Sequence, residues 1–489
     1  MATSLDIGFL LIGAFSLIYI ITSNFIRDKL YLNEALFAVM FGIIIGPHCL
    51  NLVNVDMWGI EEVVVTTEIT RVVIAIQVMI TGAVIIPGKF IYTHYRSMII
   101  MLIPVMLGMW FVSGLLVYLM IPSLDYIQAL IVASCFTPTD PVLSSSIVQG
   151  CYAEKNVRRE IRYLIAAESA GNDGLGYPFL FIAIYWMQMP VGDALRSWFL
   201  NIMLQEIALS IVLGVLVGWI VRILIKWCDK RYMVELEALH LCPLILAFIL
   251  MGSLAWMKSD DLLACFMAGC ILSWDEWFQD ETASRGSFLL VLDSLLSIGV
   301  FTYIGVTMPL SMFVELSLWR LTVLALLVLI LRRIPTVLCL YKCDPIIKNW
   351  REALFTGWFG PVGVGAIFYS AIATEGMSTF IMTDDSKSIA SILKPIVYFI
   401  VLSSVIIHGL SIPIVVVAQS IYHCIIIPTT TDIEKTTDKR PAIAFTRTTT
   451  GNISEATTAV LFNEVDNNRQ SSSPLDQQTK IKNNIVVSE

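Results

Sequence analysis

Charged side chains are scarce in this chain. Asp, Glu, Lys and Arg make up 14% of its 489 residues, whereas 57% are hydrophobic. Soluble globular proteins carry about 25% charged residues, so this composition excludes a soluble protein and indicates an all-α polytopic membrane protein surrounded by lipid. The net charge of −8 pools acids from the spans, the loops and the tail, so it points to no nucleic acid or other charged partner.

Regular cysteine patterns are also missing. The ten cysteines are scattered, with no Cys-x-x-Cys pair and no His/Cys spacing typical of metal ligands. We therefore expect no disulfide framework, no structural metal and no cofactor, and we interpret the cysteines as small apolar side chains. The first apolar run, residues 7–21, lacks both a preceding basic segment and a following cleavage site, so we expect a retained span rather than a signal peptide.

Apolar runs long enough to cross a bilayer are abundant. Thirteen of them begin near residues 7, 34, 69, 98, 126, 163, 201, 237, 261, 287, 318, 354 and 388. If the N-terminus is outside, most loop Lys and Arg residues lie on the inner side, as expected of cytoplasmic loops. We therefore predict a transmembrane domain over residues 1–428. The polar composition that follows predicts a disordered cytoplasmic tail over residues 429–489.

Two of these runs contain helix breakers near their centres. Two prolines flank Thr139 and Asp140 in the fifth run, and Gly-Pro-Val-Gly-Val-Gly at residues 360–365 interrupts the twelfth. Breaks at matching places in two halves are typical of an inverted repeat whose two discontinuous helices cross near the bilayer midplane. Four half-helix ends then meet with partial charges of both signs. The pattern favours Asp140 as a helix cap rather than a ligand, while Thr137 and Thr139 offer hydroxyls and free carbonyls.

The sixth run carries acids that hydrocarbon should exclude. Asp173 follows Glu168 and Asn172, and Ser169 lies four residues before Asp173 on the same helix face. A hard monovalent cation prefers oxygen ligands, so we expect Na⁺ to bind at Asp173, Ser169 and Thr139. A lone carboxylate in low dielectric holds either a cation or a proton, and exchange of one for the other would couple their transport.

Glu168 requires a basic partner inside the membrane. Arg332 and Arg333 lie in the middle of the eleventh run. A buried arginine without a carboxylate is costly, and a bidentate pair removes much of that cost. We favour Arg333 as the partner of Glu168, and the sequence alone leaves Arg332 open.

Five further polar residues are secondary candidates, for each of which the sequence favours an ordinary structural role. Asp260 and Asp261 precede the ninth run and suit solvated helix ends, and Asp293 suits a polar contact inside the bundle. Glu352 begins the twelfth run and suits a helix N-terminus. His408 could sense pH, but a hydrogen-bonded core histidine is the favoured interpretation.

Six short motifs occur together in the chain. They are residues 137–144 (TPTDPVLS), 167–174 (AESAGNDG), 259–263 (SDDLL), 332–335 (RRIP), 352–363 (EALFTGWFGPVG) and 403–409 (SSVIIHG). Together they resemble the fungal sodium/proton antiporters of the cation/proton antiporter superfamily, over about residues 6–428. The resemblance implies a homodimeric exchanger of thirteen spans in which a six-helix core moves like an elevator against a dimerisation domain. It also implies export of Na⁺ and Li⁺, and in some members K⁺, in exchange for H⁺ across the plasma membrane.

The resemblance also assigns roles to individual residues. Asp173 corresponds to the ion-carrying aspartate of the family. Asn172 corresponds to the neighbour of that aspartate, and Thr139, Asp140 and Ser169 to the surrounding ligands or supports. Glu168 and Arg333 correspond to the ion pair of the core domain. The chain departs from the family in two places. Its tail is shorter than that of many relatives. It also has Ala170-Gly171 where relatives often have Gly-Cys, and this second difference bears on the choice between Na⁺ and K⁺.

Three other functions remain open at this point. A K⁺/H⁺ exchanger of an internal membrane would use the same site and differ in the cation it moves. A cation channel would pass current without proton counterflow. An intramembrane enzyme fits least, because no nucleophile and base share a helix face and no metal-ligand spacing appears.

Overall fold

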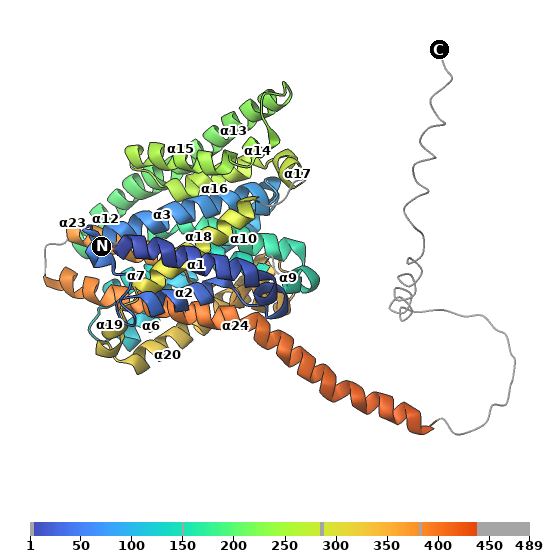
Figure 1. Cartoon of the computed structure of the whole chain (residues 1–489). Helices are drawn as coiled ribbons and strands as arrows, with labels where there is room; N and C mark the ends of the chain where they lie inside the picture. Colours follow the sequence, from blue (N-terminus) through green and yellow to red (C-terminus); the bar gives the residue numbers. More distant parts are fainter. Residues whose placement is uncertain (1–3, 149–150, 284–287, 381–383, 438–489) are drawn as a thin grey trace, which may run out of the picture. The chain divides into compact units, whose positions relative to one another are not determined.

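The chain folds almost entirely into helices. The computed structural model describes residues 4–148, 151–283, 288–380 and 384–437, and these ranges contain no β-strand. This confirms the all-α fold class expected from the composition. Residues 1–422 form one compact unit (Figure 1), and the described residues 423–437 of a second unit are helical. Of the predicted tail, residues 429–437 complete the last helix, and residues 438–489 lie outside the described residues.

The first seven predicted runs correspond to helices with several internal interruptions. The α-helices are α1 (Ser4–Asn24), α2 (Glu34–Ile45), α3 (Glu62–Ile80), α4 (Lys89–Thr93), α5 (Tyr95–Ile100), α6 (Met106–Met120), α7 (Tyr126–Cys135), α8 (Pro141–Val148), α9 (Cys151–Asn156), α10 (Arg159–Gly174), α11 (Gly176–Gln188), α12 (Val191–Ser197) and α13 (Leu209–Asp229). A 3₁₀ turn, η2 (Val55–Trp58), and π-helical turns join some of them: η1 (Phe25–Lys29), η3 (Thr81–Ile85), η4 (Met101–Val105) and η5 (Trp198–Ala208). In η4 the π-helical turn accommodates Pro104, which has no backbone N–H to donate.

The second half continues in the same way. Its helices are α14 (Leu236–Leu239), α15 (Cys242–Met257), α16 (Asp261–Leu272), α17 (Trp277–Ala283), α18 (Phe288–Val306), α19 (Leu310–Glu315), α20 (Leu318–Leu331), α21 (Ile334–Leu340), η6 (Tyr341–Cys343), α22 (Trp350–Trp358), α23 (Val364–Phe380) and α24 (Asp384–Thr437). Within the described ranges, 7 helical segments are long and apolar enough to cross a membrane. Shorter apolar helices, among them α2, α7, α15 and α16, occupy other predicted runs. The total of thirteen crossings stays a prediction.

Several long helices leave their apolar surface uncovered. Only 11% of the apolar window in α1, and 22% of that in the segment Val191–Asp229, is buried inside the unit. In water such large apolar faces would drive association, so they are typical of helices that face lipid or another membrane chain. The exposed faces of α1 and α13 therefore agree with a membrane protein.

Glycines bring helix backbones into direct contact inside the unit. Helix α3 lies in the interior against α16, α18 and α23 (Figure 1). On the neighbouring pair α2 and α18, a Cβ added to Gly42 would lie 2.1 Å from the Thr302 carbonyl oxygen, and one added to Gly305 would lie 2.3 Å from the Val39 carbonyl oxygen. Packing this close is open only to residues without a side chain, as at the small-residue contacts of membrane helices.

This contact makes a stability prediction. Gly305→Ala forces α2 and α18 apart and should lower the free energy of unfolding by about 1–3 kcal/mol, the usual cost of overpacking. Gly299→Ala on the same helix is the control, because a Cβ there would meet no atom within 4 Å. Thermal unfolding of the two purified variants in one detergent checks the prediction, and equal shifts in Tm would contradict it.

Candidate ion-binding site

The two predicted helix breaks are present, and they touch. Helix α7 ends at Cys135 and α8 begins at Pro141, while α22 ends at Trp358 and α23 begins at Val364. A proline at the first position of α8 is tolerated because the N–H it lacks would have no partner within the helix. The backbone N–H of Asp140 in the first break donates to the carbonyl of Pro361 in the second at 2.9 Å. The two discontinuous helices therefore cross at their breaks.

Asp140 caps half-helices from both halves of the chain. Its Oδ2 accepts from the Leu143 backbone N–H of α8 at 2.8 Å, and its Oδ1 accepts from the Val364 N–H of α23 at 2.7 Å. The carboxylate is 2% exposed. A negative charge at two helix N-termini is stabilised by both helix dipoles and by the N–H groups it satisfies.

Arg332 makes the complementary contacts at the opposite helix ends. Its guanidinium donates to the Phe136 carbonyl just after α7, and to the Gly360 carbonyl just after α22 at 2.5 Å. It is 1% exposed and lies where the eleventh run is interrupted between α20 and α21. Pro335 favours that interruption because it removes an N–H from the helix. One buried cation thus stabilises the C-terminal ends of both first half-helices.

Arg333 faces Glu168 in a bidentate ion pair. Its two terminal nitrogens lie 2.5 and 2.6 Å from the two carboxylate oxygens of Glu168. Its Nε also donates to the Thr356 carbonyl of α22 at 3.0 Å. Both charged side chains are buried, at 2% and 0% exposure. In such a buried bidentate pair, the two charges and their hydrogen bonds offset much of the cost of burying each group.

Four hydroxyl and amide side chains join α10 to the first break. The Asn172 amide nitrogen donates to Thr139 Oγ1 at 2.8 Å, and its Oδ1 accepts from the Thr139 backbone N–H at 3.2 Å. Ser169 Oγ lies 3.0 Å from Thr139 Oγ1 and 3.0 Å from Ser144 Oγ of α8. All four residues are fully buried. The structure thus brings together Thr139, Ser169 and Asn172 as a compact set of oxygen and amide groups.

Asp173 lies in the last turn of α10, one turn after Ser169. It is 1% exposed, and neither of its carboxylate oxygens has a hydrogen-bond partner within the described part of the chain. Asp140 and Asp260 are near enough to repel its negative charge. Its backbone carbonyl accepts from the Tyr369 hydroxyl of α23. A buried carboxylate in this condition is stable only when a cation or a proton neutralises it.

The prediction that Asp260 and Asp261 are solvated helix ends is wrong. They are 2% and 4% exposed. Asp260 Oδ1 caps α16 by accepting from the Leu262 N–H at 3.0 Å, and Asp261 Oδ2 accepts from Arg71 Nε of α3 at 2.8 Å. The cap and the ion pair offset part of the cost of burying these two acids. Asp260 Oδ2 has no hydrogen-bond partner within the described residues.

The remaining candidates lie apart from Asp173. Thr137 donates to the Ala133 carbonyl of its own helix at 2.8 Å. Glu352 near the start of α22 accepts from Arg158 at 3.0 Å, and the buried His408 Nε2 lies 3.0 Å from the Trp358 carbonyl. Asp293 is half-buried in α18. No hydrogen bond links any of them to the Asp173 carboxylate within the described ranges.

Three residues that contact the candidate residues were not identified from the sequence: Arg71, Ser144 and Tyr369. Arg71 could have been found by the argument used for Arg333, since an arginine inside an apolar run needs an acid. Ser144 and Tyr369 carried no such signal, because their partners are a serine hydroxyl and a backbone carbonyl brought near by tertiary packing.

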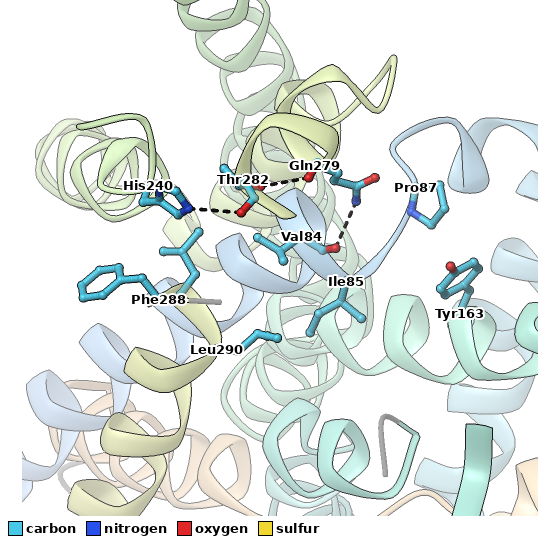
Figure 2. Close-up of a pocket in the computed structure, with 10 residues that line it drawn as sticks. Val84, Ile85, Pro87, Tyr163, His240, Gln279, Thr282, Phe288 and Leu290 are labelled. Atoms are coloured by element: carbon cyan, nitrogen blue, oxygen red, sulfur yellow. Dashed lines mark hydrogen bonds between the residues drawn. The ribbon is translucent and has the colours of Figure 1, made fainter. Parts of the chain in front are cut away.

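A separate cavity of about 200 Å³ lies near the ends of η3 and α17. Figure 2 shows Gln279 donating to the Val84 carbonyl at 3.1 Å, and His240 beside the Thr282 carbonyl at 3.2 Å. Tyr163 also lines it, but no candidate ion-binding residue does. The cavity is therefore distinct from the site at Asp173.

Comparisons with known proteins agree with this geometry. A family model described as "Sodium/hydrogen exchanger, transmembrane" matches residues 13–418. A probable Na⁺/H⁺ antiporter of Schizosaccharomyces pombe is 38% identical over 422 residues, covering 83% of this chain and 55% of that protein. A Na⁺/H⁺ antiporter of Saccharomyces cerevisiae is 35% identical, with coverages of 84% and 44%. Another of S. pombe is 35% identical, with coverages of 83% and 89%.

The fold is also similar to a solved structure. The sodium proton antiporter MjNhaP1 of Methanocaldococcus jannaschii matches with a TM-score of 0.63 and 18% identity, covering 82% of this chain and 97% of that one. At this identity the match shows the fold alone. This chain spans about half the length of the first S. pombe relative and of the S. cerevisiae relative.

The Glu168–Arg333 pair predicts strong coupling in stability. Glu168→Gln or Arg333→Gln leaves one buried charge unpaired, so each should lower the free energy of unfolding by about 3–5 kcal/mol. The double variant removes both charges and should cost clearly less than the sum of the two. Thermal unfolding of the purified proteins measures this cycle.

The pair Arg158–Glu352 is the matched control, because its side chains are 33% and 19% exposed. The same cycle there should give a coupling of about 1 kcal/mol or less. Equal coupling in the two cycles would show that the buried pair contributes no more than a surface one.

Proposed function

We propose that this chain, which belongs to the sodium/hydrogen exchanger family, is a secondary-active antiporter that exports Na⁺ and Li⁺ in exchange for H⁺ across the plasma membrane. Its membership confirms the family expected from the six motifs. Transport of K⁺ is an open alternative, because only some members of the family that the motifs resemble move it. The observation that carries the proposal is the Asp173 carboxylate, buried beside the helix crossing without a hydrogen-bond donor among the described residues.

The charge on Asp173 couples the two ions. The neighbouring acids are already satisfied, Asp140 by two helix N-termini and Glu168 by Arg333. Asp173 has no such partner, so its negative charge is covered either by an alkali cation or by a proton. One carboxylate cannot hold both ions at once, so binding of one releases the other. The Asp173 carboxylate therefore crosses the membrane only with a cation or a proton bound.

The cation is held by oxygen ligands around that carboxylate. Ser169 lies one turn before Asp173 on the same face, and Thr139 is bonded to Ser169 at 3.0 Å. Asn172 orients Thr139 through two hydrogen bonds. Hydroxyl and carboxylate oxygens are suitable ligands for Na⁺ and Li⁺. Asn172 is thus a support of the site, while Asp173, Ser169 and Thr139 contact the ion.

Alternating access follows the elevator scheme that the resemblance implies. Asp140, Arg332 and Arg333 link the interrupted helices to α10 and to the junction of α20 and α21, which supports their moving as one body. A homodimer would hold the remaining helices still in the membrane. The exposed apolar faces of α1 and α13 offer surface for lipid and for such a partner.

Transport by reconstituted protein tests the central role of Asp173. With the full chain in proteoliposomes, Na⁺ and Li⁺ should each dissipate an imposed proton gradient. Asp173→Asn should abolish exchange for every cation, because an amide carries no negative charge for a cation or a proton to neutralise. Asp193→Asn, an exposed acid of α12, should exchange like the wild type.

The result also separates the rival functions. Exchange with K⁺ but not with Na⁺ or Li⁺ would favour a K⁺/H⁺ exchanger. Currents that need no pH gradient and persist in Asp173→Asn would instead identify a channel.

Competition at one carboxylate also predicts the pH dependence of transport. As pH falls on the cation-binding side, protons occupy Asp173 and the apparent KM for Na⁺ should rise, approaching about tenfold per pH unit while the site is mostly protonated. The maximal rate at saturating Na⁺ should stay unchanged. Initial rates measured over a range of Na⁺ concentrations and pH values check this, and a falling maximal rate with constant KM would rule out simple competition.

A further inference from the structure

Three buried acids at the helix crossing each lie against a glycine. A Cβ added to these glycines would lie within 2.6 Å of a carboxylate oxygen: 2.6 Å from Asp173 Oδ1 at Gly365, 2.5 Å from Asp140 Oδ1 at Gly363 and 2.5 Å from Asp260 Oδ2 at Gly174. No side chain fits at such distances. Each carboxylate therefore packs directly on the backbone of another helix segment.

Hydrogen bonds from helix N-termini distinguish two of these three carboxylates from that of Asp173. Asp140 lies against Gly363 because its Oδ1 accepts from the backbone N–H of the next residue, Val364, at 2.7 Å. Asp260 Oδ1 caps α16 at Leu262, while its Oδ2, the atom beside Gly174, has no hydrogen-bond partner within the described residues. The Asp173 carboxylate accepts no hydrogen bond within the described ranges, so capping does not explain why it lies against Gly365. We infer that Gly365 determines the size of the cation that Asp173 accepts.

The inference rests on the proposed function and concerns the wall of its binding site. Gly365 lies in the first turn of α23. That helix is held by Asp140 at Val364, and again by the bond from the Tyr369 hydroxyl to the Asp173 carbonyl. Anchored on both sides of Gly365, its backbone is a rigid boundary beside the carboxylate. A larger ion cannot gain room by pushing this wall away.

A methyl group at position 365 would move the boundary toward the carboxylate. Either the space beside Asp173 shrinks or the carboxylate turns away from its ligands, and both effects weaken binding most for the largest ion. Binding should therefore fall most for K⁺, less for Na⁺ and least for Li⁺. A proton bonds directly to a carboxylate oxygen and needs no such space, so proton binding should change least.

Transport with Gly365→Ala in proteoliposomes tests this inference. The ratio of the apparent KM for Na⁺ to that for Li⁺ should rise about tenfold relative to wild type, the size expected for one overpacked methyl group. Gly376→Ala is the control in the same helix, because its Cβ would meet only the end of Ile184, at an ordinary 3.7 Å. It should keep the wild-type ratio.

The outcomes separate this inference from the proposed function. If wild type exchanges Na⁺ and Li⁺ for H⁺ and Gly365→Ala leaves their KM ratio unchanged, the role of Gly365 is wrong while the exchanger remains. A shift of the same size in Gly376→Ala also overturns it. If wild type exchanges no cation for H⁺, the proposed function fails and this inference fails with it.

A second measurement uses only the wild-type protein, in case Gly365→Ala does not fold. Thermal unfolding is followed in LiCl, NaCl, KCl, RbCl and CsCl at equal ionic strength. A rigid wall predicts that stabilisation falls steeply from the small ions to Rb⁺ and Cs⁺. Equal stabilisation by Cs⁺ and Li⁺ would overturn the role of Gly365.

Discussion

The crossing of the two interrupted helices depends on two opposite charges, each of which serves both halves of the chain. Asp140 accepts from the N-termini of α8 and α23, and Arg332 donates to the carbonyl ends that follow α7 and α22. Unsatisfied backbone groups are costly in hydrocarbon, so a break in a membrane helix persists only where other groups replace the lost bonds. Here one anion and one cation do so for four helix ends.

The parts of this arrangement that depend on local chemistry could be predicted from the sequence. Proline and glycine placed the breaks, and the burial cost of an arginine led to Arg333 as the partner of Glu168. Contacts that arise only from tertiary packing were not accessible. Nothing in the sequence pairs Tyr369 with the carbonyl of Asp173, and the burial of Asp260 and Asp261 depends on how α3 and α16 pack.

The same packing explains why small residues concentrate at the site. Because a glycine has no side chain, a carboxylate on one helix can lie directly against the backbone of the next. At Gly363 this closeness allows a hydrogen bond from the Val364 N–H to Asp140. At Gly365 it allows no bond to Asp173 within the described chain, so the contact there carries a packing constraint without a compensating interaction.

The lack of a hydrogen-bond partner for the Asp173 carboxylate among the described residues links the stability of the site to transport. Every other acid at the crossing is paired or caps a helix, and those contacts make the surrounding framework rigid. The cost of burying Asp173 then cannot be relieved by rearranging the framework and must be met by a positive particle from outside the protein. A rigid site of this kind is selective because its walls do not adapt, and it is reversible because no protein group competes permanently for the carboxylate. The features that stabilise the crossing are therefore the ones that keep one carboxylate available to an ion.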